Sequence, residues 1–386
     1  MNKKTLLLDV TNNCNLNCIH CYNANAIKDK QDIRLDDIFK IVKEKNVEHI
    51  HLIGGEPLLF KKLDKLIDKN KELIFSINTN GILINSIIEN GLLFNRNIKE
   101  ITISIDGFDS KTNDRIRGKG TYNIVSQEID KLIKFRNKYR SDLKILLSVV
   151  ILPDNAQNLQ ELNIKNFTNV DNFLISTMYM EGNALNNIKT NESFYHSYIK
   201  IIENIINSEF SQKFIIDTTP LYMYMYEIHG ELCKCNDNND VIYSDNKGNI
   251  YSCIPEKFNL DKSNNNININ GNMENKICMF CKFYSECKVC KFNLFLDRYK
   301  YCEALISYLF EKYKKVKIKE NVIIKRYLNN VFIISVTKNN ILKLHKNLFE
   351  KLFYIEDEYL IIKCKEYNTQ YLEYFKILIN RYSYER

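Results

Sequence analysis

The chain has 386 residues, of which 45% are hydrophobic and 26% are charged. This balance is typical of a globular protein with enough apolar material for two or three domains. The longest apolar runs, such as 331–336, are strand-sized, which excludes a bilayer-spanning segment. The basic start leads only into the apolar run 6–8, which ends at Asp9 without a small-residue cleavage site. We therefore expect a cytoplasmic protein with no membrane partner.

The net charge of +8 comes from scattered lysines. A nucleic-acid-binding protein usually carries a basic stripe or a recognisable module, and the sequence has neither, so we expect no nucleic-acid partner. A coding bias toward Lys, Asn and Ile explains the charge, and attraction of an acidic partner stays open as the alternative.

Cysteine is the informative residue type. Eleven of the twelve cysteines fall in two groups, residues 14–21 and 233–302, and only Cys364 stands apart. Cytosolic thiols rarely form structural disulfides, so clustering of this kind indicates metal binding. Cys364 is expected to be a small buried hydrophobe.

Residues 4–180 alternate between strand-like and helix-like segments. The helix-like segments, such as 35–45 and 63–71, have apolar residues three and four positions apart. Regular alternation of this kind predicts an α/β fold with a parallel sheet, here a partial (β/α)6 TIM-like barrel with ligand chemistry at the carboxyl ends of its strands. The six predicted strands are 5–10, 49–53, 73–78, 101–105, 143–151 and 173–178.

The remainder of the chain is divided by its composition. Residues 190–230 are predicted to be helical, and 231–303 are rich in Cys, Asn and Gly, as expected of a fold held by metal. We expect an exposed loop at 261–272. The domains are predicted as 1–205, 206–303 and a small α+β extension, 304–386. The extension is predicted to contain a hairpin of strands 322–327 and 331–336, a helix at 341–352, a strand at 359–364 and a helix at 370–381.

The first cysteine group, Cys14, Cys18 and Cys21, directly follows the first predicted strand. Three thiolates from one short loop can hold three irons of a [4Fe–4S] cluster and leave the fourth iron open for a small chelating molecule. A zinc knuckle and unligated surface thiols are the alternatives. Zinc usually takes a fourth protein ligand, and His20 is poorly placed for this between two cysteines.

This loop resembles the signature of the radical SAM superfamily, in which three cysteines follow the first strand of a partial barrel. The resemblance implies that S-adenosylmethionine chelates the open iron. An electron from a low-potential donor of the flavodoxin or ferredoxin type then releases a 5′-deoxyadenosyl radical, which abstracts hydrogen from the substrate. His20 occupies the position of an aromatic residue that packs near the adenine.

Gly54, Gly55, Glu56 and Pro57 follow the second strand. Two glycines allow close approach of the backbone, and a neighbouring carboxylate can accept hydrogen bonds from an ammonium group. By itself the pair of glycines indicates a turn. At this distance after the cysteines, it resembles the family motif for the methionine amino group.

Further motifs follow later strands. The resemblance implies that Ser104 and Asp106 line the ribose and that Arg117 lies near the methionine carboxylate, for which a guanidinium is well suited. A turn with an exposed arginine is the alternative. Asn80 is a further candidate cofactor contact, although the segment 78–81 could equally be a tight turn. The segment 180–182 also matches the family pattern, but it suggests no role.

The second cysteine group supplies eight thiolates, enough for two further [4Fe–4S] clusters. Its spacing resembles the SPASM domain of peptide-modifying radical SAM enzymes, with one departure: the last block is one residue short. A zinc ribbon is the alternative. The resemblance implies one auxiliary cluster on Cys253 and Cys290 with Cys235 and Cys233, and a second on Cys278, Cys281, Cys287 and Cys302. Cys233 and Cys235 are only two positions apart, so a first cluster that uses just one of them stays open as an alternative.

Together these features predict a maturase that modifies a peptide or protein side chain by a crosslink, a thioether or an epimerisation. A sulfatase-maturing, formylglycine-forming enzyme is the alternative. It is weakened because Ile254, directly after Cys253 of the motif Gly248-x4-Cys253, stands where the resemblance leads us to expect an acid. A non-catalytic iron–sulfur electron carrier and a zinc-stabilised binding protein are readings from other classes. We expect no peptide-binding module before Cys14, so that leader recognition would fall to 304–386 or to a separate partner.

Overall fold

The computed structural model describes the following residues: 3–25, 30–218, 223, 225, 240–254, 256–258, 298–313, and the backbone of 315–317, 322–327, 330–335, 340–345, 353–356 and 359–362. The chain divides into two compact units. The first comprises 1–218, 229–271 and 287–297, and the second comprises 219–228, 272–286 and 298–386.

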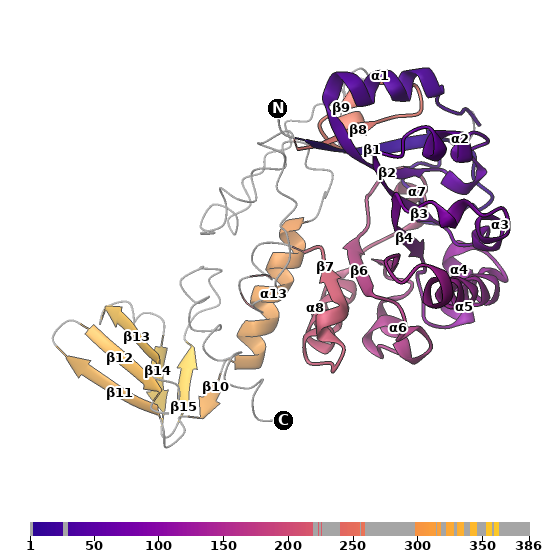
Figure 1. Ribbon diagram of the computed structural model, residues 1–386. Helices are drawn as coiled ribbons and strands as arrows, with labels where there is room; N and C mark the ends of the chain where they lie inside the picture. Colours follow the sequence, from indigo (N-terminus) through magenta and orange to yellow (C-terminus); the bar gives the residue numbers. More distant parts are fainter. Residues whose placement is uncertain are drawn as a thin grey trace. The chain divides into compact units, whose positions relative to one another are not determined.

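The first unit is built on a nine-stranded sheet in the order β7-β6-β5-β4-β3-β2-β1-β8-β9 (Figure 1). All neighbouring strands are parallel except β8 and β9, which form an antiparallel pair. The strands are β1 (Lys4–Thr11), β2 (Val47–Gly54), β3 (Ile74–Thr79), β4 (Ile98–Ser104), β5 (Lys144–Ile151), β6 (Asn172–Thr177), β7 (Phe214–Ile216), β8 (Val241–Ser244) and β9 (Ile250–Tyr251).

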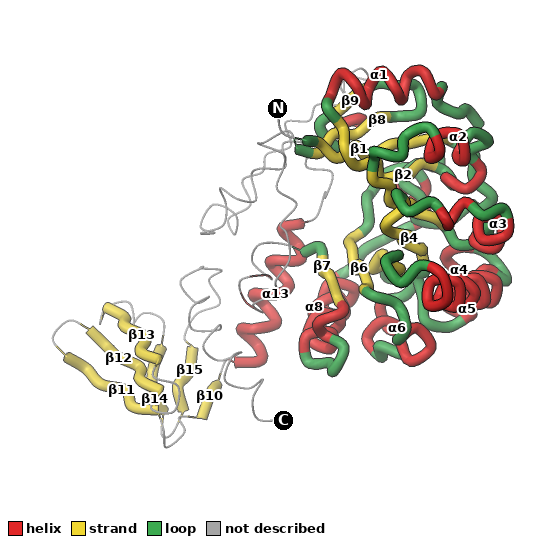
Figure 2. Tube along the Cα trace, in the orientation of Figure 1, coloured by secondary structure: helices red, strands yellow, loops and turns green. Residues whose placement is uncertain are grey.

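Helices alternate with the parallel strands along the chain (Figure 2). They are α1 (Leu35–Lys45), α2 (Leu63–Asp68), α3 (Ile84–Glu89), α4 (Ser110–Arg117), α5 (Thr121–Tyr139), α6 (Ala156–Gln160), α7 (Asn183–Asn187) and α8 (Glu192–Ile206). The ribbon shows helices such as α1, α3 and α5 on the outside of the curved sheet (Figure 1).

The two faces of the sheet differ in chemistry because side chains alternate along each strand. One face is apolar and packs on the helices, as shown by Ile103 of β4, whose side chain lies beside Val125 of α5 at Gly81. The opposite face carries polar side chains, including Asp9 of β1, His51 of β2 and Asn78 of β3. His51 Nε2 lies 3.0 Å from Asn78 Oδ1. The inner face of the partial barrel is therefore polar.

The predicted architecture of the N-terminal part is confirmed, since all six predicted strands occur in the expected parallel order. Their observed ends differ from the predicted ones by up to three residues. Strands β7, β8 and β9 were not predicted, because two to four residues are too short to give a periodic pattern. The helical prediction for 190–230 is correct for α8, is wrong at β7, and lies mostly outside the described residues after 218.

The second unit contains α13 (Arg298–Tyr313) and two three-stranded sheets. The sheets contain β10 (Lys315–Lys317), β15 (Tyr359–Ile362) and β14 (Phe353–Glu356), and β11 (Val322–Tyr327), β12 (Asn330–Ser335) and β13 (Asn340–His345). The predicted hairpin is confirmed as β11 and β12, and the strand predicted at 359–364 as β15.

The helix predicted at 341–352 is wrong at its start, where the chain forms β13 and pairs antiparallel with β12. In this pairing, Leu342 lies opposite Ile333 and Leu344 opposite Val331. The apolar spacing of this segment is compatible with a helix or a strand, and pairing with β12 decides in favour of the strand. The loop predicted at 261–272, the helix predicted at 370–381 and Cys364 lie outside the described residues. Within the described parts of the chain, no helix has the length and apolar character needed to cross a membrane.

Candidate functional site

The first cysteine loop leaves the carboxyl end of β1 and bears Cys14, Cys18 and Cys21. All three thiols are partly exposed and none is in a disulfide bond. Burial raises the pKa of each thiol, and that of Cys21 to about 12. The neighbouring thiols raise the pKa of Cys21 further, so the three sulfurs are close enough to interact. A bound cation would favour the thiolate forms of these three groups.

Three thiolates from one short loop are a donor set that suits an iron–sulfur cluster. The described residues contain no group of three or more His, Cys, Asp or Glu side chains placed to hold one metal ion. In a cubane each thiolate binds a different iron, so three sulfurs need not converge on one point. Backbone N–H groups also point at the sulfurs, with Leu16 N donating to Cys14 Sγ at 3.5 Å. Such hydrogen bonds stabilise bound thiolates.

Gly54 and Gly55 press against the start of the cysteine loop. Gly55 N donates to Thr11 O at 2.8 Å, and Glu56 N donates to Asn13 O at 2.8 Å. A Cβ atom on Gly55 would overlap Asn13 O and would lie 2.8 Å from Asn12 O. The glycine pair therefore allows the end of β2 to approach the backbone immediately before Cys14.

Glu56 is fully buried and ties this turn to the end of β3. Its Oε1 accepts hydrogen bonds from Leu58 N at 3.0 Å and from Thr79 Oγ1 at 2.8 Å, and its Oε2 accepts one from Asn80 N at 2.7 Å. Burial raises the pKa of Glu56, whereas the hydrogen bonds from Asn80, Leu58 and Thr79 act in the opposite direction. The Asn80 side chain donates to Asn15 Oδ1 at 2.7 Å and lies 4.0 Å from Cys14 Sγ.

The segment after β6 holds the other end of the cysteine loop. Asn183 N donates to Cys21 O at 2.9 Å, and Asn183 Nδ2 donates to Cys18 O at 3.0 Å. Asn187 Nδ2 donates to Ile19 O at 3.1 Å. Gly182 has φ 56° and ψ −126°, and a Cβ there would lie 2.5 Å from Cys21 O. The sequence suggested no role for this segment, although it contains Gly182-Asn183 after a predicted strand and a second asparagine, Asn187, four positions later.

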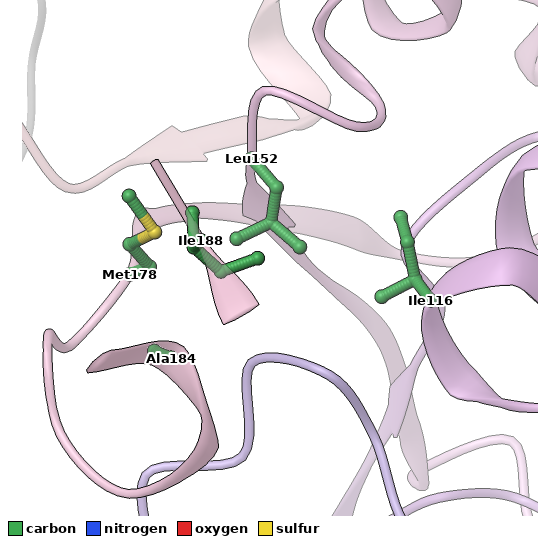
Figure 3. Close-up of a cluster of buried hydrophobic side chains, with 5 residues drawn as sticks. All are labelled: Ile116, Leu152, Met178, Ala184 and Ile188. Atoms are coloured by element: carbon green, nitrogen blue, oxygen red, sulfur yellow. The ribbon is translucent and has the colours of Figure 1, made fainter. Parts of the chain in front are cut away.

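An apolar cluster packs against the middle of the cysteine loop. Its five members come from α4, the end of β5 and the region after β6: Ile116, Leu152, Met178, Ala184 and Ile188 (Figure 3). Ile19, which lies between Cys18 and Cys21, packs against this cluster, and Ile19 N donates to Ile116 O at 3.0 Å. The loop is thus anchored to α4, which ends at Arg117.

Asp106, Arg117 and His20 form a buried charged group beside this anchor. Arg117 Nε lies 2.7 Å from Asp106 Oδ2, with side-chain exposures of 8% and 0%. His20 Nε2 lies 3.4 Å from the same oxygen. Asp106 Oδ1 accepts a hydrogen bond from Val150 N at 2.9 Å. Burial lowers the pKa of His20, the Asp106 charge raises it, and the Arg117 charge lowers it again.

The structure thus brings together His20, Gly54, Gly55, Glu56, Asn80, Asp106 and Arg117 around the three cysteines. Ser104 is the last residue of β4, partly exposed, and lies opposite Ser148 of β5. Of the second cysteine group, Cys253 follows β9 in the first unit, and Cys302 lies on α13 in the second unit. The remaining six lie outside the described residues: Cys233, Cys235, Cys278, Cys281, Cys287 and Cys290.

Comparison with known proteins agrees with this geometry. Residues 8–163 match the family described as the radical SAM superfamily. The mycofactocin maturase MftC of Mycolicibacterium smegmatis is 27% identical over 161 residues, covering 40% of each chain. The GTP 3′,8-cyclase of Clostridium botulinum is 29% identical over 143 residues, covering 34% of this chain and 44% of the cyclase.

Among solved structures, Streptococcus suis SuiB bound to S-adenosylmethionine has 20% identity and a TM-score of 0.48, covering 66% of this chain and 60% of SuiB. The chain spans less than half the length of the maturase and of the cyclase.

Proposed function

From the premise that residues 8–163 belong to the radical SAM superfamily, we propose that this chain reductively cleaves S-adenosylmethionine and modifies a peptide or protein side chain. The observation that carries the proposal is the position of the three-cysteine loop. It is fastened on one side by the Gly54-Gly55-Glu56 turn and on the other by the region of Arg117 and Asn183.

In this proposal Cys14, Cys18 and Cys21 hold the cluster. A [4Fe–4S] cluster bound there would supply the electron for reductive cleavage of S-adenosylmethionine, and through it the radical chemistry that removes hydrogen from the substrate. The protein binds and orients the reactants. Arg117 would offer its guanidinium to the methionine carboxylate, and backbone carbonyls of the Gly54–Gly55 turn would accept hydrogen bonds from the methionine amino group.

In this proposal the carboxylates of Glu56 and Asp106 bind mainly to other groups of the protein and not to the cofactor. Glu56 and Asp106 are both 0% exposed, and each already accepts hydrogen bonds from backbone N–H groups of a neighbouring strand or loop. A direct contact with the ribose or the ammonium would require one of these hydrogen bonds to be given up. In our proposal their first role is to fix Asn80 and Arg117, which then meet the cofactor.

A peptide or protein substrate is proposed from the second cysteine group, whose spacing resembles the SPASM domain, and from the relationship to a maturase. The cyclase relative acts on a nucleotide by its name, so the barrel alone does not choose the substrate class. Two auxiliary [4Fe–4S] clusters and a flavodoxin- or ferredoxin-type donor belong to the same proposal. The sulfatase-maturing reaction is less favoured because Ile254 replaces the expected acid.

The test is anaerobic reconstitution followed by iron counting and incubation with dithionite and S-adenosylmethionine. We expect 5′-deoxyadenosine from the intact protein and none from a Cys14→Ala/Cys18→Ala/Cys21→Ala variant that still carries auxiliary iron. Absence of 5′-deoxyadenosine from the intact, iron-loaded protein would refute the proposal.

The substrate class is tested by deuterium transfer. Perdeuterated peptides encoded by neighbouring genes and deuterated GTP are offered in separate reactions. Deuterium in 5′-deoxyadenosine from a peptide only would support the maturase, and deuterium from GTP only would reject it.

A further inference from the structure

A second charged group lies on the inner face of the sheet, away from Arg117. Asp9 of β1 is fully buried, and its Oδ2 accepts a hydrogen bond from Tyr243 Oη of β8 at 2.5 Å. Lys257 Nζ lies 3.5 Å from the same oxygen and 3.1 Å from Tyr243 Oη. Tyr243 is fully buried, and the Lys257 side chain is 13% exposed. These three residues form a closed triangle of contacts.

The triangle connects the two cysteine groups. Asp9 lies five residues before Cys14, and Lys257 lies four residues after Cys253. The Cys253 segment is locally ordered, since Glu256 N donates to Cys253 O at 3.2 Å and Ser252 Oγ donates to Glu256 Oε2 at 2.7 Å. Lys257 therefore belongs to the same locally ordered segment as Cys253.

Aromatic rings form a second connection beside the first. Tyr22 directly follows Cys21, and its ring lies edge-on to Phe258 with the centroids 6.0 Å apart. Lys257 Nζ lies 5.5 Å from the centroid of Phe258 and 5.6 Å from that of Tyr243, within the range of a cation–π interaction. The residue after Cys21 thus touches the segment that follows Cys253.

Stability alone does not explain this arrangement. Taking an aspartate and a lysine out of water is unfavourable, and apolar residues of similar volume often stabilise a core as well or better. Asp9 Oδ1 also has no hydrogen-bond partner among the described residues. Burial raises the pKa of Asp9, and Lys257 and Tyr243 act against this shift, so the carboxylate depends on both. Directional contacts such as those of Asp9 with Lys257 and Tyr243 favour one relative position of the two chain segments over other packed arrangements.

We propose that Asp9, Tyr243 and Lys257 are positioning residues that hold the Cys253 segment in register with the radical-generating cysteine loop and thereby build the auxiliary cluster site at Cys253. The inference rests on the proposed function, because it takes Cys253 as a ligand of an auxiliary cluster. It concerns neither S-adenosylmethionine binding nor the first cluster.

The experiment uses the full chain with Cys14, Cys18 and Cys21 replaced by alanine, so that only auxiliary iron remains. Lys257→Met keeps the apolar stem and removes the charge, Asp9→Asn removes the carboxylate, and Lys257→Arg is the conservative rescue. The control is Lys3→Met, because Lys3 lies directly before β1 and forms an exposed ion pair with Glu48 at 3.0 Å. Iron per chain, the EPR spectrum after reduction and the midpoint potential are measured.

We expect Lys257→Met and Asp9→Asn to lose about four irons per chain, one cluster, or to shift the EPR spectrum and midpoint potential of that cluster. Lys257→Arg and Lys3→Met should retain the parent values. Parent iron, spectrum and potential in both Lys257→Met and Asp9→Asn would overturn the inference.

Two further outcomes separate this inference from the proposed function. A parent without iron would overturn the auxiliary cluster and this inference with it, while 5′-deoxyadenosine from the intact protein would show that the radical chemistry stands. Lys257→Met in the intact background should still bind S-adenosylmethionine at the first cluster, seen as a change in its EPR signal. This result would show that loss of auxiliary iron does not come from an unfolded barrel.

Discussion

Gly182→Ala provides a sharp test of how the cysteine loop is held. Gly182 has φ 56° and ψ −126°, outside the regions open to residues with a side chain. Forcing alanine into such a conformation costs about 1–3 kcal/mol. The new methyl group would also lie 2.5 Å from Cys21 O and 2.6 Å from Tyr22 O, and overpacking of this kind costs about 1–3 kcal/mol. The two effects add to about 2–6 kcal/mol, which the structure can relieve only by moving the cysteine loop away from α7.

Hydrogen exchange in the metal-free protein measures this local effect. The reporters are the amides of Ile19, which donates to Ile116 O, and of Asn183, which donates to Cys21 O. A local loss of about 2 kcal/mol corresponds to a roughly 30-fold faster exchange. We expect at least this acceleration in Gly182→Ala, together with reduced iron in the first cluster after reconstitution.

Gly120→Ala is the control. Gly120 also has a positive φ, 83°, but a Cβ there meets no atom within 4 Å. It should therefore show backbone strain of about 1–2 kcal/mol near α5 and normal exchange at Ile19 and Asn183. Equal exchange and equal iron in Gly182→Ala and wild type would refute the view that Gly182 seats the cysteine loop.

Three other changes test separate parts of the barrel. Asp106→Asn leaves the buried Arg117 without its charged partner, and we expect S-adenosylmethionine binding to weaken roughly tenfold or more at unchanged iron content, measured by EPR titration. Glu56→Gln places an amide NH₂ group opposite the backbone N–H groups that donate to the carboxylate, so that a donor faces a donor. We expect the unfolding free energy of the metal-free protein, measured by thermal denaturation, to fall by about 1–3 kcal/mol. Arg140→Met removes all five donors from three backbone carbonyls and Asp142, and should destabilise by about 3 kcal/mol or more in urea unfolding. Hydrogen bonds from Arg140 hold the pKa of Asp142 below its ordinary value. This carboxylate therefore stabilises the fold above about pH 4, and the contribution is lost as the pH falls. In Arg140→Met the unfolding free energy should depend less on pH in the acid range.

Exposed ion pairs supply the controls for these three variants. Asp154→Asn removes the partner of Arg115, whose side chain is 53% exposed, and should leave S-adenosylmethionine binding unchanged. Lys71→Met breaks the exposed pair with Asp68 and should change stability by less than about 1 kcal/mol. Equal affinity for S-adenosylmethionine in Asp106→Asn and Asp154→Asn would show that Asp106 has no role in binding the cofactor.

The sequence was sufficient for the six barrel strands because each is a short run rich in β-branched residues or leucine. The burial of these strands depends on their own side chains and on the adjacent amphipathic helices, so local patterns suffice. Strand β8 has only four residues, and its place beside β1 depends on pairing Leu7 with Tyr243, more than two hundred residues away. No window of sequence contains that information. The same reason explains the wrong helix at β13, whose pairing with β12 outweighs its own ambiguous spacing.

The candidate site shows a similar division between local and distant information. The cysteine spacing and the Gly54-Gly55-Glu56 turn are local, and both were visible in the sequence. The bonds from Asn183 to Cys18 and from Asn187 to Ile19 join residues more than 160 positions apart. Amide side chains are common in this chain, so their type alone does not single them out.

Burial changes how the acidic motif residues are understood. In the sequence, Glu56 and Asp106 look like groups that contact a ligand, because carboxylates next to glycines at strand ends often do. In the structure, both are fully buried and bound to backbone amides, and Asp106 also holds Arg117. A carboxylate that already satisfies a buried amide and a buried cation gains little by turning to a ligand, because the groups it leaves would lose their partners. In the proposed function, the chemistry of the site therefore depends on groups that these acids hold in place: the cysteine loop, Asn80 and the guanidinium of Arg117.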